Sequence, residues 1–280
     1  MKRILTIQDI SCVGKCSLTA ALPIISAMGV ECGILPTAVL STHTAFEGFT
    51  FCDLTDEIKN IKNHWLRENI DFDAIYTGYL GSMKQIALVS EIFDDFKNND
   101  NLIIIDPVMG DNGKLYPGFS NDFPKEMLKL CSKADIILPN ITEACFMLGK
   151  EYIEKGYDEN YIKDMLRELC TYGAKISVIT GVSFNDGELG VMSYNSETNK
   201  FFSYYNDKIK ARYHGTGDVF ASCMTGALAR GLSVENSLKL AADYTARAIQ
   251  ATINDKNGNW YGVNFEQEIP YLLDCIAKIL

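Results

Sequence analysis

The chain has 280 residues, of which 47% are hydrophobic and 22% are charged, as in ordinary globular proteins. Its formal net charge of −10 excludes a basic nucleic-acid-binding surface as a property of the whole chain. The apolar stretch near the start ends at Gln8 and Asp9, too early for a signal peptide or a membrane anchor. We therefore expect a cytoplasmic protein with one domain over residues 1–280 and with neither nucleic acid nor membrane among its partners.

The nine cysteines form no CxxC pair, and their odd number argues against a complete disulfide framework. We expect most of them to be reduced core residues. The three histidines, His43, His64 and His214, have no zinc-ligand spacing. This spacing disfavours a metallohydrolase.

Short β-branched runs alternate with longer helical patterns along the chain. The predicted strands are 4–7, 31–37, 74–77, 102–105, 135–138 and 176–180. The predicted helices are 16–28, 54–69, 83–98, 122–131, 159–172, 216–230 and 234–253, with Gly29 and Gly231 as helix stops. Such alternation is typical of a parallel sheet that is covered on both faces. A polar hairpin at 188–205 interrupts it, so we expect an α/β fold with a mostly parallel central sheet and an antiparallel edge.

The strongest local motif is a glycine turn that opens the predicted helix 216–230. Gly215, Thr216, Gly217 and Asp218 follow His214 in this turn. Glycines at a helix start let free N–H groups approach an anion such as a transferring phosphate, and Asp218 can then accept a hydroxyl proton. An ordinary helix start with a stabilising first-turn acid is the alternative interpretation.

Two further acidic segments follow predicted strands. Asp106 comes directly after the strand 102–105, before Pro107, and Asp111 lies deeper in the same loop. We interpret these acids as candidate metal ligands for phosphoryl transfer. The alternative interpretation is a turn residue for Asp106 and a solvated surface residue for Asp111. Asn140 and Glu143 have the spacing of a helix capping box, which alone explains the pair structurally.

A phosphate-loop NTPase is excluded by the first loop. The segment 14–17 has no glycine five positions before Gly14, and Cys16 replaces the Ser or Thr that such a loop requires. The first strand also lacks the GxGxxG turn of a dinucleotide-dependent oxidoreductase. That class and a non-catalytic small-molecule sensor remain alternatives of other kinds.

Taken in order, the motifs at 106–110, 140–143 and 215–218 resemble those of ribokinase-like kinases. The segments Ile7-Gln8, Ser41-Thr42-His43-Thr44 and Thr77-Gly78-Tyr79-Leu80-Gly81-Ser82 are similar to the pyridoxal/pyridoxamine kinase branch, and the similarity runs over nearly the whole chain. The resemblance implies a three-layer α/β/α ribokinase-like fold and an ATP-dependent kinase that phosphorylates the hydroxymethyl group of pyridoxal, pyridoxamine or pyridoxine. It also implies a homodimer.

The resemblance assigns a role to each motif residue. Asp218 is the catalytic base, and Gly215, Thr216 and Gly217 cradle the phosphate. Asp106 and Glu143 bind Mg²⁺ with ATP, directly or through water, and the fold also admits a monovalent cation. The nucleotide contacts are Asn140, Glu143, Thr180 and Gly181. The substrate contacts are Asp9, His43, Thr44 and Tyr79.

One position departs from the family pattern. Asp9 follows Ile7-Gln8 where many pyridoxal kinases have serine, and an ionised carboxylate accepts hydrogen bonds but cannot donate one. We therefore expect pyridoxamine to be used at least as well as pyridoxal. Hydroxymethylpyrimidine kinase is the alternative within the kinases; its relatives often have Cys at the position of Asp218.

Overall fold

The computed structural model describes residues 1–279. By their internal contacts these residues fall into two compact units. The first unit contains Met1–Tyr76 and the segment from Ile209 onward, and the second contains Thr77–Lys208. The expectation of one domain over 1–280 stays a prediction.

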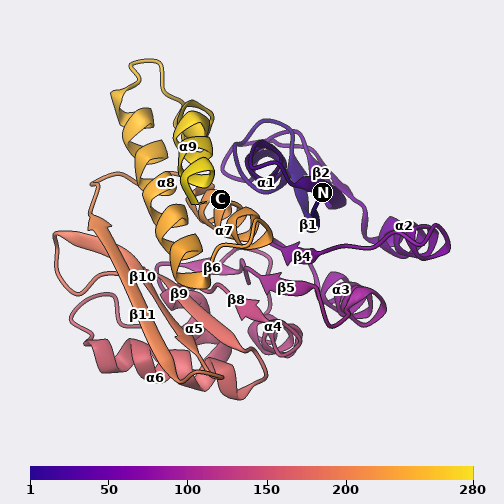
Figure 1. The fold of residues 1–280 in the computed structure, drawn as a ribbon, viewed down its shortest axis with the longest axis horizontal. Coiled ribbons are helices and arrows are strands. Elements are labelled where there is room, and N and C mark those ends of the chain that lie inside the picture. Colours follow the sequence, from indigo (N-terminus) through magenta and orange to yellow (C-terminus); the bar gives the residue numbers. More distant parts are fainter. Residues whose placement is uncertain (280) are drawn as a thin grey trace. The chain divides into compact units, whose positions relative to one another are not determined.

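The first unit is built on a short piece of sheet. Strands β1 (Arg3–Ser11) and β2 (Glu31–Leu40) are parallel, and their register shifts between Gln8 and Ile10. Strand β3 (Phe51–Asp53) adds to β2 in the antiparallel sense. The helical elements are α1 (Leu18–Ala27), α2 (Thr55–Arg67), α7 (Thr216–Ala229), α8 (Val234–Asn254), the 3₁₀ turn η1 (Phe265–Glu268) and α9 (Ile269–Ile279). Helices α8 and α9 pack against each other (Figure 1).

The second unit contains the antiparallel edge. Its strands pair in the order β11-β10-β9-β8-β5, with β5/β8 and β8/β9 parallel and β9/β10 and β10/β11 antiparallel. Their bounds are β5 (Leu102–Ile105), β8 (Ile136–Ile137), β9 (Ile176–Val182), β10 (Glu188–Asn195) and β11 (Lys200–Asp207). The helices are α3 (Met83–Phe96), α4 (Phe123–Cys131), α5 (Ile141–Leu148) and α6 (Glu159–Thr171). Helix α6 covers β9 and β10 (Figure 1).

Small residues allow close helix packing in the first unit. A Cβ on Gly226 of α7 would lie 2.4 Å from Met28 Sδ, so the run of small residues in α7 lets it approach the end of α1. Gly29 follows with φ of +77°, in the left-handed region that glycine adopts more readily than other residues. Both glycines therefore fix how α1 ends against α7.

The predicted elements are confirmed with small shifts at their ends, and the hairpin at 188–205 is strands β10 and β11. Strand β4 (Ala74–Thr77) has the predicted bounds. Some elements were not predicted. They are β3, the two-residue strands β6 (Gly110–Asp111) and β7 (Lys114–Leu115), helix α5, the 3₁₀ turn η1 and α9. Of α5, only the capping box at its start was predicted.

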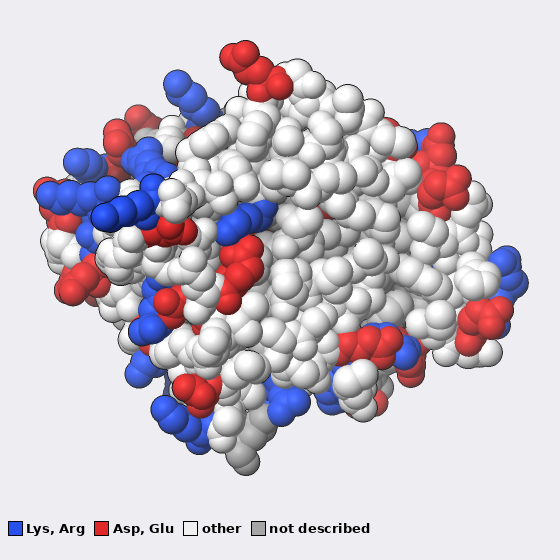
Figure 2. Space-filling model, turned by 90° about the horizontal axis from the view of Figure 1, so that it is seen from above, with Lys and Arg blue, Asp and Glu red and all other residues white. Residues whose placement is uncertain are grey.

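Charged side chains of both signs lie side by side on the surface. On the face drawn in Figure 2 they gather at the left and along the edges, around a broad uncharged centre. Elsewhere in the described chain, Lys133 pairs with Asp94 (2.7 Å) and Lys150 with Glu168 (2.8 Å). Within residues 1–279, no helix combines the length and the apolar character needed to cross a membrane.

Candidate active site

The candidate residues form two groups, one in each unit. The first unit contains Asp9, His43, Thr44, Gly215, Thr216, Gly217 and Asp218. The second unit contains Tyr79, Asp106, Asn140, Glu143, Thr180 and Gly181.

The glycine turn forms the start of α7. Gly215 is the N-cap, with φ of +78°, and a Cβ on it would lie 2.2 Å from the carbonyl oxygen of Lys15. A Cβ on exposed Gly217 would meet nothing within 4 Å. The Val219 N–H donates to Gly215 O (3.0 Å) as the first bond of the helix, so the preceding N–H groups have no partner within it. The turn can therefore bind an anion over Gly217.

Asp218 lies in the first turn of α7, and its carboxylate accepts a hydrogen bond from the backbone N–H of Ser17. Burial raises the pKa of Asp218, the hydrogen bond from Ser17 lowers it, and the charge of Asp9 raises it. Together they give a pKa of about 7. A general base works best when its pKa is close to the operating pH. Asp218 therefore has the position and the basicity of a proton acceptor.

His43 is held as a neutral ring. The Ala45 N–H donates a hydrogen bond to Nδ1 (3.1 Å), so Nε2 carries the proton. The Nε2–H group donates a hydrogen bond to Tyr261 O (3.0 Å). Burial lowers the pKa of His43, and His214, whose ring centroid is 5.0 Å away, lowers it further, while the hydrogen bond to Tyr261 opposes this. Thr44, next to it, is exposed.

Aromatic side chains surround His43 that sequence reasoning missed. The ring centroids of Phe46 and Trp260 are 4.6 Å apart, and both rings approach His43, at 5.1 and 5.9 Å. Trp260 is 57% exposed. Such rings offer flat apolar faces to an aromatic ligand, and the sequence carries no local signal for their contact with His43.

In the second unit, Asn140 and Glu143 form the predicted capping box of α5. The Glu143 N–H donates to Asn140 Oδ1 (3.0 Å), and the Asn140 N–H donates to Glu143 Oε2 (2.8 Å). Glu143 Oε1 also accepts from the N–H of Met109 (3.0 Å) and, at 3.5 Å, from that of Gly110. Glu143 therefore caps α5 and fixes the loop after β5 with the same carboxylate.

Asp106 follows β5 directly, as predicted. It is buried, and its N–H donates to Thr77 O (2.9 Å). Asp106 and Glu143 are close enough for both charges to raise the pKa of the buried Cys131 thiol, after burial itself. Asp111 is exposed in the β6–β7 hairpin and accepts hydrogen bonds from Asn112, in agreement with its solvated interpretation.

The donor set around Glu143 fits a hard cation. Burial raises the pKa of Glu143 despite its three N–H donors, and Asp111 raises it further. Mg²⁺ is often bound by one or two carboxylates together with water and substrate phosphates, which matches a site with two carboxylates. Within residues 1–279 no group of three or more His, Cys, Asp or Glu side chains forms a metal cage.

The remaining candidates of the second unit border these acids or follow β4. Thr180 forms a parallel bridge with Asn140, its N–H donates to Pro139 O (3.0 Å), and exposed Gly181 follows with φ of +76°. Tyr79, after β4, is half-buried, with its ring centroid 5.7 Å from that of Phe119. The structure therefore brings Thr180 next to Asn140, and it gives Tyr79 an aromatic neighbour.

Comparisons with known proteins agree on the family. A family model described as phosphomethylpyrimidine kinase matches residues 16–262. Pyridoxal kinase from Dictyostelium discoideum is 28% identical over 245 residues, which are 80% of this chain and 77% of that protein. Pyridoxal kinase from Lactobacillus plantarum has 31% identity and a TM-score of 0.89, with 98% of this chain and 97% of the other covered.

A protein from Bacteroides thetaiotaomicron, assigned to the phosphomethylpyrimidine kinases and crystallised with pyridoxal, is 41% identical with a TM-score of 0.92. The match covers 97% of this chain and 95% of that chain. The fold class predicted from the sequence, a mostly parallel sheet with an antiparallel edge and surrounding helices, is confirmed by these neighbours. The chain therefore belongs to the phosphomethylpyrimidine kinase family, and it is a ribokinase-like kinase that resembles the pyridoxal kinases within it.

Proposed function

We propose that this kinase transfers the γ-phosphoryl group of ATP to the hydroxymethyl oxygen of a vitamin B6 compound: pyridoxal, pyridoxamine or pyridoxine. The single observation that carries the proposal is Asp218, whose carboxylate lies in the first turn of α7 with a pKa raised to about 7 by burial. The likeness to pyridoxal kinases supports the choice of acceptor.

In this proposal Asp218 accepts the proton of the substrate hydroxyl as the oxygen attacks the γ-phosphorus. The bond between that phosphorus and the leaving oxygen of ADP breaks in line, and no covalent enzyme intermediate is needed. The N–H groups of Thr216 and Gly217 stabilise the charge on the transferring phosphoryl group. In the first unit, the neutral His43 ring, Thr44 and the nearby Trp260 are proposed as contacts of the pyridine ring. The substrate contact expected at Tyr79, in the second unit, stays a prediction.

The nucleotide side of the proposal belongs to the second unit. Asn140, Thr180 and Gly181 are proposed to lie along the phosphates of ATP. Asp106 and Glu143 would hold Mg²⁺, Glu143 through water because both of its oxygens already accept backbone N–H groups. The ion supplies positive charge that neutralises the phosphate oxygens. A homodimer is proposed from the family resemblance alone, and a cytoplasmic location stays the expectation drawn from the sequence.

The test measures ATP consumption by the purified protein with pyridoxal, pyridoxamine, pyridoxine and hydroxymethylpyrimidine as separate acceptors. We expect turnover with at least one vitamin B6 compound, and its loss in Asp218→Asn. Phosphorylation of the acceptor is confirmed by mass spectrometry, with the protein without acceptor as the control for ATP hydrolysis. An enzyme that consumes ATP with none of the three B6 compounds contradicts the proposal.

Hydroxymethylpyrimidine is the second candidate acceptor, and the family description of the matching model favours it. Both acceptors present a hydroxymethyl group on an aromatic nitrogen heterocycle, so the same base and the same anion site serve either one. The value of kcat/KM for each acceptor decides between them, because that ratio reports differential binding of the transition state.

A further inference from the structure

Asp9 lies where β1 departs from regular pairing. Gln8 is paired with Pro36 and Ile10 with Val39, so the register with β2 shifts at Asp9. Irregular pairing of this kind re-aims a side chain and is common next to active sites. The Asp9 side chain is only 5% exposed, so its carboxylate requires hydrogen-bond donors from its surroundings.

Two serines of the chain supply those donors. Ser17 Oγ donates to Asp9 Oδ1 (2.6 Å), and Ser11 Oγ donates to Asp9 Oδ2 (3.0 Å). The carboxylate of Asp9 therefore needs no donor from a substrate. Both carboxylate oxygens are engaged by the protein itself.

Ser17 also has an unusual backbone. Its φ of +47° and ψ of −133° lie in a region that residues other than glycine rarely adopt. Strain of this kind costs on the order of 1–3 kcal/mol and persists only where the surrounding structure imposes it. The hydrogen bond to Asp9 is one such restraint, and the strained backbone directs the Ser17 N–H to the carboxylate of Asp218.

We propose that Asp9 is a positioning residue for the catalytic base: it holds Ser17 through the side-chain hydroxyl, and Ser17 in turn holds Asp218 through its backbone N–H. This inference rests on the proposed function. The chain of contacts runs from the irregular site in β1, through the residue before α1, to the first turn of α7. Asp9 thus acts on phosphoryl transfer without touching the acceptor.

The charged and titratable groups around Asp218 are few. Asp9 and the Cys16 thiol face it, and burial followed by the charges of Asp218 and Asp9 raises the pKa of Cys16, which keeps the thiol neutral. The Lys15 ammonium is engaged by Asn264 Oδ1 (2.8 Å) and Glu266 Oε2 (3.0 Å). Asp9 is therefore the negative group that tunes Asp218.

The experiment measures kcat and KM between pH 5 and pH 9 for wild type, Asp9→Ala, Asp9→Asn and Ser17→Ala. Ser11→Ala is the matched control, because it removes a serine donor from Asp9 but leaves the path through Ser17 to Asp218. We expect kcat to fall about ten- to hundredfold in Asp9→Ala and in Ser17→Ala, as misplacement of a reacting group by about 1 Å can do. We expect kcat of Ser11→Ala to fall less than about threefold. We expect kcat of the Asp9→Ala/Ser17→Ala double variant to be no lower than that of either single variant, because the two residues act on Asp218 through the same contacts.

Asp9→Asn keeps an oxygen that can accept from Ser17 but removes the negative charge. The acid limb of its kcat profile should move to lower pH, because Asp9 no longer raises the proton affinity of Asp218. A purely structural role would leave that limb in place. Thermal melting of each variant reports its folding, and Ser17→Ala still tests the path if Asp9→Ala does not fold.

Two results overturn the inference. One is a change of KM and of the ranking among the B6 compounds in the Asp9 variants, with kcat and its acid limb unchanged, which places Asp9 against the substrate. The other is full activity in Ser17→Ala. If wild type itself phosphorylates no B6 compound, the proposed function fails and the inference fails with it.

Discussion

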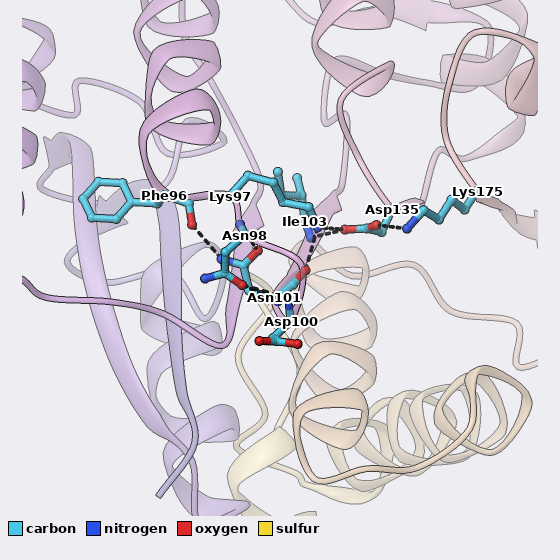
Figure 3. Close-up of polar contacts among 8 residues, drawn as sticks. All are labelled: Phe96, Lys97, Asn98, Asp100, Asn101, Ile103, Asp135 and Lys175. Carbon is cyan, nitrogen blue, oxygen red and sulfur yellow. Dashed lines mark hydrogen bonds and ion pairs between the residues drawn. The ribbon is translucent and has the colours of Figure 1, made fainter.

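The buried carboxylates at the two ends of β8 in the second unit differ in their hydrogen-bond partners. Before β8, Asp135 accepts from Lys97 Nζ (2.5 Å) and the Ile103 N–H (2.8 Å) through one oxygen and from Lys175 Nζ (2.9 Å) through the other (Figure 3). After β8, Glu143 accepts only backbone N–H groups, and within residues 1–279 it pairs with no Lys or Arg.

The pKa values of these two acids follow their partners. Burial alone would raise the pKa of Asp135, but the hydrogen bonds from Lys97, Ile103 and Lys175 outweigh it and the pKa is lowered. Burial raises the pKa of Glu143 because no cation compensates for it. A buried carboxylate with its own cations is structural, whereas one without them has room for a cation that arrives with a ligand. Asp218 in the first unit is half-buried, and its raised pKa places it with this second kind.

The largest expected effect is on turnover, and it comes from replacing Asp218, a carboxylate without a cation partner in the described part of the chain. We expect Asp218→Asn to lower kcat about 10²- to 10⁴-fold, the usual contribution of a positioned base, while the protein folds and binds ATP as before. Steady-state kinetics with circular dichroism and nucleotide titration measure these properties. Near-normal turnover in this variant would remove the base assignment.

Asp135→Ala should act on stability instead. It leaves the buried Ile103 N–H without its acceptor and Lys97, one-third exposed, without its carboxylate. Loss of such a buried hydrogen-bond partner costs about 1–3 kcal/mol of the free energy of unfolding. Urea unfolding measures this cost, and we expect kcat of the folded protein to change less than about twofold. Lys133→Ala is the control, because the Lys133–Asp94 pair is exposed and such pairs contribute about 0–1 kcal/mol. A variant as stable as wild type would contradict the contrast with Glu143.

Variants of Glu143 test whether one carboxylate is both structural, as the cap of α5, and functional, as part of the proposed Mg²⁺ site. Asp106→Ala and Glu143→Gln should each raise the Mg²⁺ concentration needed for half-maximal activity about 10- to 100-fold, as loss of a direct or water-mediated metal contact does. Glu143→Gln still accepts the N–H of Asn140 and so retains much of the cap, whereas Glu143→Ala should also lower thermal stability. Full activity of Glu143→Gln would make its role structural.

The smallest expected effect is a dependence of stability on pH. The folded-state pKa of Asp218, about 7, lies well above the ordinary value of an aspartate, so its contribution to stability is present below about pH 4 and is lost as the pH rises through about 7. Asp218→Asn removes this loss. Its melting temperature relative to wild type should therefore rise by a few degrees between pH 4 and pH 8, since about 1 kcal/mol shifts Tm by about 2–4 °C. A constant difference across this range would contradict the raised pKa.

Sequence reasoning predicted the elements whose signals are local. The capping box at Asn140 and Glu143 and the glycine stops at Gly29 and Gly231 follow from residue type and spacing, and the structure confirms them. The three-residue strand β3 and the two-residue strands β6 and β7 exist through pairing with a neighbour. Periodicity over so few residues cannot reveal that pairing.

The candidate site could be predicted only in part for the same reason. Asp218 and the glycine turn were located by their motif. The hydrogen bond from Ser17 to Asp218 depends on a positive φ at a serine, and residue type does not encode that conformation. Trp260 reaches His43 from 217 positions farther along the chain, a contact that only the fold determines.

The capping box at Asn140 and Glu143 affects how inactive relatives of this protein can be identified from genome sequences. Because Glu143 caps α5 and fixes the loop after β5, selection for folding alone preserves the Asn-x-x-Glu pattern in a lineage that has lost its chemistry. Asp218 has the opposite property, since its partly desolvated charge opposes folding above neutral pH and drift would replace it soon after catalysis ceased. An intact Asn-x-x-Glu pattern with a substituted residue at the position of Asp218 would therefore mark a pseudoenzyme, and the two positions should be scored separately.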